Sequence, residues 1–127
     1  MSAGGASGRR RFLRRATAAV AGLATAGLAG RCVGPDREAI AAWAAGLDPD
    51  LDCSDLSGLW PAEARTRETN EYVPRSPHAD TFCFSCTNFQ PAHDPRACGE
   101  CNTVKGPIDP GGWCKSWTEN PSWAPPA

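Results

Sequence analysis

The clearest hydrophobic periodicity in the 127-residue chain covers a short stretch. Ile40, Trp43 and Leu47 recur at the spacing of one face of a helix. Asp36 lies where a helix N-cap is expected, and Pro49 limits how far the helix extends. We therefore predict one short helix that begins after Asp36 and packs Trp43 toward the interior.

The chain from Tyr72 onward sustains neither a helical nor a strand-like pattern. Six prolines interrupt residues 72–114, and proline disrupts both helix interiors and central strands. We predict mostly turns in this part of the chain. One short helix is expected near Cys83, and a small antiparallel hairpin is expected before Cys114.

The composition limits the size of the hydrophobic core. Only 41% of the residues are hydrophobic, and 12 Pro and 13 Gly add irregular backbone. A core of this size is marginal for a small domain on its own. We therefore expect a covalent or metal staple to contribute to stability.

The first 30 residues carry the pattern of an export signal. The run from Arg9 to Leu13 matches the twin-arginine type, and an uncharged apolar run follows over residues 16–30. That run is shorter than the roughly 20 residues that a membrane-spanning helix needs. We expect residues 1–30 to be removed, which leaves a periplasmic protein without stable membrane insertion. The twin-arginine route exports folded proteins, so it favours a cofactor that is inserted before export.

Removal of the signal leaves an acidic chain. Residues 31–127 contain 8 Arg and Lys but all 14 Asp and Glu, so the net charge is about −6. Binding to nucleic acid depends on positively charged side chains. We therefore expect no nucleic-acid partner.

Five of the seven cysteines are concentrated in one segment, and two sets of four fit a metal site. Thiolates that converge from separate loops bind zinc or iron–sulfur clusters. Cys83, Cys86, Cys98 and Cys101 have the C-x2-C-x11-C-x2-C spacing typical of zinc-ribbon or rubredoxin-like single-metal sites. The other set replaces Cys98 by Cys114, which gives C-x2-C-x14-C-x12-C and a Gly-Gly-Trp-Cys ending.

The second set and the residues around it resemble the high-potential iron–sulfur protein (HiPIP) family over residues 72–117. The resemblance rests on the close pair of cysteines, on Cys101 two residues after a glycine, and on the closing run Ile108–Cys114. It implies a small, mostly irregular fold with short helices and a small antiparallel hairpin around one 4Fe–4S cluster. The implied ligands are Cys83, Cys86, Cys101 and Cys114, and the implied shielding residues are Tyr72, Phe89, Trp113 and Trp117.

The resemblance implies electron transfer, and no grouping of catalytic side chains indicates an enzyme. A cubane on four thiolates carries a net charge of about −2 or −1 in its 2+ and 3+ core states. An apolar cage disfavours any further negative charge. The chain is therefore expected to be a soluble periplasmic one-electron carrier that uses the 2+/3+ couple. The implied partners are a membrane cytochrome complex and a reaction centre or terminal oxidase.

Two cysteines lie outside both sets. Cys32 and Cys53 flank the predicted helix, and an exported protein meets oxidising conditions. We predict a Cys32–Cys53 disulfide within an acidic, partly helical extension over residues 31–71, followed by the iron–sulfur domain over residues 72–127. A cofactor-free interaction domain stapled by disulfides is a third interpretation, which the odd number of cysteines disfavours.

Overall fold

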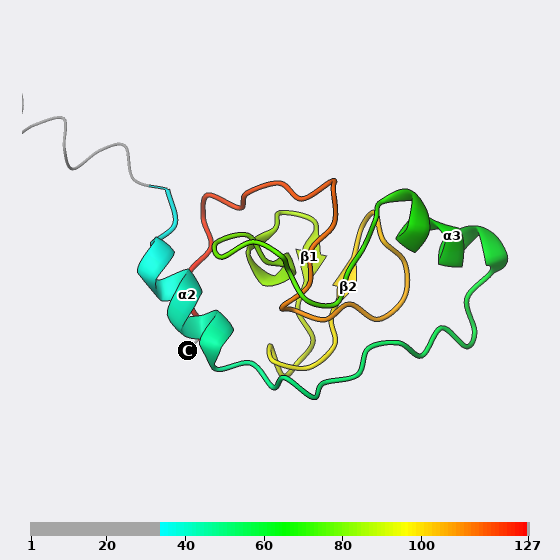
Figure 1. The fold of residues 1–127 in the computed structure, drawn as a ribbon, viewed down its shortest axis with the longest axis horizontal. Helices are drawn as coiled ribbons and strands as arrows, with labels where there is room; N and C mark the ends of the chain where they lie inside the picture. Colours follow the sequence, from blue (N-terminus) through cyan, green and yellow to red (C-terminus); the bar gives the residue numbers. More distant parts are fainter. Residues whose placement is uncertain (1–33, 127) are drawn as a thin grey trace, which may run out of the picture. The chain divides into compact units, whose positions relative to one another are not determined.

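The computed structural model describes residues 34–126, so the predicted signal and Cys32 lie outside the described residues. The described part contains two α-helices, one 3-10 turn and two short strands (Figure 1). In chain order they are α2 (Arg37–Ala45), α3 (Pro61–Thr69), η1 (Cys83–Ser85), β1 (Phe89–Gln90) and β2 (Glu100–Cys101). Neither α-helix in this part has the length and apolar character needed to cross a membrane.

The helix predicted after Asp36 is confirmed as α2. The Asp36 carboxylate caps α2 by accepting a hydrogen bond of 2.9 Å from the Glu38 N–H. Ile40 and Trp43 are the buried residues of the helix. The Trp43 ring lies 4.7 Å, between centroids, from the ring of Phe84 in η1. This contact ties α2 to the cysteine-rich segment, and both belong to one unit, Gly34–Ala127.

A second helix, α3, lies where the sequence pattern predicted none. Pro61 occupies its first turn, where a missing N–H costs nothing, and the Glu63 carboxylate accepts a 2.9 Å hydrogen bond from the Trp60 N–H. No residue of α3 is buried. The helix therefore lacks the apolar stripe by which amphipathic helices are recognised in a sequence.

Polar side chains of α3 hold the loop that precedes the closing run. The Arg67 guanidinium donates hydrogen bonds of 3.0 Å to the carbonyl of Lys105 and 2.9 Å to that of Pro107. The Thr66 hydroxyl accepts a 2.9 Å hydrogen bond from the Lys105 N–H. These contacts fix a loop that has no regular secondary structure of its own.

The predicted hairpin and the short helix near Cys83 are both confirmed. β1 and β2 pair antiparallel, with Phe89 opposite Cys101 and Gln90 opposite Glu100. Most of the remaining chain is irregular and is joined by isolated antiparallel bridges. These bridges are Val73 to Trp113, Cys86 to Glu119 and Gly99 to Ile108.

The apolar interior consists of two small groups of buried side chains. Ile40, Trp43 and Phe84 form one of them, against which Trp123 of the C-terminal segment packs. The second group includes two of the cysteines, and its buried members are Cys83, Val104, Ile108 and Cys114. Phe89 packs against both groups.

The predicted disulfide between Cys32 and Cys53 is wrong, because Cys53 is bonded to Cys98. Their Cα atoms lie 5.7 Å apart, within the usual range for a disulfide, although 45 positions separate them in sequence. The segment after α2 passes beside the loop that joins β1 and β2 (Figure 1). No pattern in the sequence indicated this approach, and closeness along the chain therefore favoured the wrong partner.

We predict that peptide mapping of the unreduced protein links Cys53 to Cys98. Replacement of both by alanine should lower the free energy of unfolding by about 4 kcal/mol, because the crosslink restricts a long loop of the unfolded chain. Denaturant unfolding of this double variant would be compared with that of Cys32→Ala, which should match wild type. A Cys32–Cys53 peptide would contradict the assignment.

Candidate metal centre

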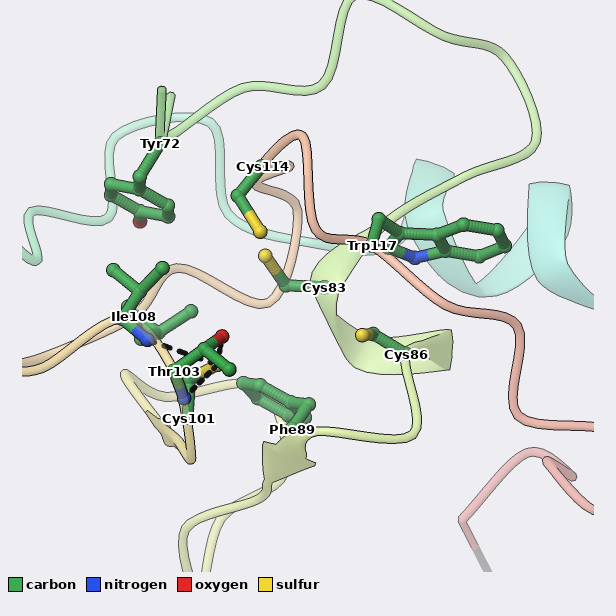
Figure 2. Close-up of a pocket in the computed structure, with 10 residues that line it drawn as sticks. Tyr72, Cys83, Cys86, Phe89, Cys101, Thr103, Ile108, Cys114 and Trp117 are labelled. Atoms are coloured by element: carbon green, nitrogen blue, oxygen red, sulfur yellow. Dashed lines mark hydrogen bonds between the residues drawn. The ribbon is translucent and has the colours of Figure 1, made fainter. Parts of the chain in front are cut away.

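Four cysteine side chains from separate segments line one apolar cavity. They are Cys83, Cys86, Cys101 and Cys114, and all four are free thiols. Figure 2 shows the sulfur atoms of Cys83, Cys86 and Cys114 turned toward the space between the labelled residues. These three thiols are buried, whereas Cys101 is partly exposed. The structure thus gathers the four thiols that the family resemblance selected.

The first pair of thiols is fixed by η1 and by the closing run. The Cys86 N–H donates to the Cys83 carbonyl at 3.0 Å, which closes the turn. The Cys83 N–H donates to the Gly112 carbonyl at 2.7 Å, and the Phe84 N–H donates to the Pro110 carbonyl at 2.9 Å. The first two thiols and the fourth are therefore held by one backbone network.

The glycine before Trp113 is required by close backbone packing. Val73 and Trp113 exchange hydrogen bonds of 2.8 and 2.9 Å between their main chains. A Cβ atom on Gly112 would lie 2.7 Å from the Val73 carbonyl oxygen, which is too close for any side chain. The Gly-Gly-Trp-Cys ending thus brings the chain alongside Val73 and turns Cys114 into the cavity.

The β1–β2 pair positions Cys101. Cys101 lies opposite Phe89, and the Asn102 N–H donates to the Asn88 carbonyl at 3.0 Å. A Cβ atom on Gly99 would lie 2.5 Å from Cζ of Phe89. Glycine two residues before the thiol therefore leaves room for the Phe89 ring, which forms part of the cavity wall.

Apolar side chains complete the wall of the cavity. Tyr72, Phe89 and Trp117, three of the four aromatic residues expected to shield the site, line it. The sequence pattern did not single out two further apolar lining residues, Val104 and Ile108, each only 1% exposed. Single aliphatic residues in an irregular segment carry no periodic signal that marks them as buried.

Trp113, the fourth expected shielding residue, does not line the cavity. Successive side chains of an extended chain point to opposite sides, and the neighbouring Cys114 faces the cavity. The Trp113 ring instead packs edge-on against His78, with 4.9 Å between ring centroids. The expected shielding role of Trp113 is therefore corrected to a contact outside the cavity.

Tyr72 is held at two points. Its hydroxyl oxygen accepts a 2.9 Å hydrogen bond from the Asp109 N–H, and the Arg67 guanidinium carbon lies 4.5 Å from the ring centroid. Burial raises the pKa of Tyr72 to about 12, although the hydrogen bond from Asp109 acts in the opposite direction. The ring therefore contributes a neutral wall at physiological pH.

The electrostatics of the cavity favour a positively charged occupant. Burial raises the pKa of the Cys83 thiol, and the neighbouring thiols raise it further. Burial also raises the pKa of Cys114, partly offset by a hydrogen bond from the Ser116 N–H. Thiols in such a site stay protonated unless a cation stabilises the thiolate, and metal coordination does so directly.

The arrangement of the donors argues against the zinc-ribbon or rubredoxin-like alternative. That alternative needs Cys98, whose sulfur is bonded to Cys53. Within residues 34–126, no three His, Cys, Asp or Glu side chains are grouped closely enough to hold a single metal ion. Four thiols spread around one cavity suit a cluster in which each thiolate binds a different metal ion.

Comparison with solved structures identifies a similar protein. The HiPIP of Rhodothermus marinus is 43% identical to this chain, with a TM-score of 0.52. The similarity covers 55% of this chain and 95% of the Rhodothermus marinus chain. No protein-family model matches the sequence, and no curated protein sequence does.

We predict that Tyr72→Phe lowers the free energy of unfolding by about 1–3 kcal/mol, because the partly buried Asp109 N–H loses its acceptor while the ring is retained. Denaturant unfolding measures the loss, and amide hydrogen exchange should show that the Asp109 N–H exchanges faster. Unchanged stability and exchange would show that the Tyr72 hydroxyl does not hold the closing run.

Proposed function

Because the chain belongs to the high-potential iron–sulfur protein family, we propose that it is a small electron carrier with one 4Fe–4S cluster on its four free thiols. The observation that carries the proposal is the convergence of these thiols on one apolar cavity. When bound, the cluster supplies one-electron exchange between its 2+ and 3+ core states. The ligands are Cys83, Cys86, Cys101 and Cys114.

The apolar wall of the cavity favours the couple between the 2+ and 3+ core states. Four thiolates give the bound group a charge of about −2 in the 2+ state and −1 in the 3+ state. A wall without charged side chains makes a charge of −3 costly, so reduction beyond the 2+ state is disfavoured. The potential of the protein is therefore expected toward the positive end of the iron–sulfur range.

The aromatic and aliphatic residues of the wall exclude water. Tyr72, Phe89 and Trp117 cover the cavity, and Val104 and Ile108 are almost completely buried beside it. Trp117 is itself fixed by a 2.8 Å hydrogen bond from its indole N–H to the Phe82 carbonyl. Rigid rings limit hydrolysis of the cluster and also limit the reorganisation of solvent that accompanies electron transfer.

We propose the periplasm as the location and membrane-associated redox proteins as the partners. The twin-arginine pattern over residues 9–13 and the acidic balance of the chain after residue 30 support this proposal. A membrane cytochrome complex would donate one electron, and a reaction centre or terminal oxidase would accept it. The protein itself makes and breaks no bond with substrate.

The proposed couple predicts which redox state is paramagnetic. The 2+ core has an even electron count and the 3+ core an odd one, so oxidation should produce the electron paramagnetic resonance signal. The reduced protein should be silent, and titration with ferricyanide should give about one spin per chain. Dithionite should add no signal. A signal that appears on reduction, with none on oxidation, would contradict the proposed couple.

The ligand assignment predicts different outcomes at two neighbouring cysteines. Cys101→Ser should lose most of the visible absorbance, because it alters a cluster ligand. Cys98→Ser should retain the full iron content, because Cys98 is bonded to Cys53 and takes no part in the site. The reverse result, with absorbance kept in Cys101→Ser and lost in Cys98→Ser, would refute the assignment.

A further inference from the structure

Hydrogen-bond donors are distributed unevenly over the four cysteine sulfur atoms. Sγ of Cys101 accepts from the N–H groups of Thr103 at 3.4 Å and Val104 at 3.5 Å. Sγ of Cys86 accepts one such bond, from the Thr118 N–H at 3.4 Å. Cys101 is also the most exposed of the four thiols. The sulfur that accepts the most backbone hydrogen bonds thus belongs to the most exposed of the four cysteines.

A third donor to Cys101 comes from a side chain. Oγ1 of Thr103 lies 3.3 Å from Sγ of Cys101 (Figure 2). A thiolate bound to a metal has no proton to donate, so the hydroxyl must be the donor when Cys101 is a ligand. Within residues 34–126, this is the one side-chain hydrogen bond to any of the four ligand sulfurs. Backbone donors are set by the fold, whereas this donor depends on the identity of residue 103.

We propose that Thr103 is a positioning residue that tunes the reduction potential of the site through Cys101. This inference rests on the proposed function. Reduction adds negative charge, which the thiolate sulfurs share, and a hydroxyl donor stabilises the more negative state. The Thr103 hydroxyl therefore raises the potential. The most exposed of the four cysteines thus receives a donor that is fixed by the chain.

The two groups of the threonine side chain can be tested separately. Thr103→Val keeps the shape and removes the hydroxyl, whereas Thr103→Ser keeps the hydroxyl and removes the methyl group. Thr118→Val is a matched control, because the Thr118 hydroxyl donates to the Ser116 carbonyl at 3.2 Å and not to a cysteine sulfur. The Thr118 N–H to Cys86 is a backbone bond and remains in this variant.

The reduction potential of each holoprotein would be measured by equilibrium titration with mediators. Thr103→Val should shift the equilibrium toward the oxidised state by roughly threefold to tenfold, where tenfold corresponds to about 59 mV for one electron. Thr103→Ser and Thr118→Val should match wild type in potential. If Thr103→Val does not assemble, Thr103→Ala provides the second variant without a hydroxyl and should show the same shift.

The outcomes separate this inference from the proposed function. If the wild-type protein holds no cluster, the proposed function fails. If all variants hold the cluster and Thr103→Val has the wild-type potential, the inference alone is overturned. An equal shift in Thr103→Val and Thr118→Val would also overturn it, because the effect would then reflect general polarity near the site. A purely structural role would change the unfolding midpoint and leave the potential unchanged.

Discussion

The structure depends on the convergence of four free thiols, three of them buried, on one apolar cavity. Burial raises the pKa of Cys83 and Cys114, so this interior favours thiolates only when a cation binds them. Regular secondary structure is too scarce to hold the thiols in place. They are positioned instead by backbone hydrogen bonds among η1, the β1–β2 pair and the closing run. Metal binding is therefore expected to be inseparable from the stability of this part of the protein.

The segment that precedes Tyr72 supports the site from outside. Arg67 of α3 bonds to the loop before the closing run and also lies over the Tyr72 ring. The Cys53–Cys98 disulfide joins the same preceding segment to the loop that leads into β2. A third contact is the packing of Trp43 on Phe84. The acidic extension thus stabilises the irregular segments that carry the thiols.

Local signals in the sequence were sufficient for part of this arrangement. Asp36 and the periodic residues after it predicted α2 correctly, because capping and helix spacing are properties of neighbouring residues. α3 could not be predicted from periodicity, since its role depends on the polar contacts of Arg67 and not on an apolar stripe. The Cys53–Cys98 bond depends on a distant chain approach. Trp113 was misplaced because a shift of one residue along an extended chain reverses the direction of the side chain.

The central claim is that four thiols hold one cluster of several iron ions, and elemental analysis tests it most directly. The protein should be exported by cells, or refolded, in the presence of iron and sulfide. Its contents of iron, acid-labile sulfide and zinc per chain should then be measured. The account predicts about four iron and four sulfide per chain and no stoichiometric zinc. One iron or one zinc per chain without sulfide would contradict it, because the cavity would then bind a single metal ion.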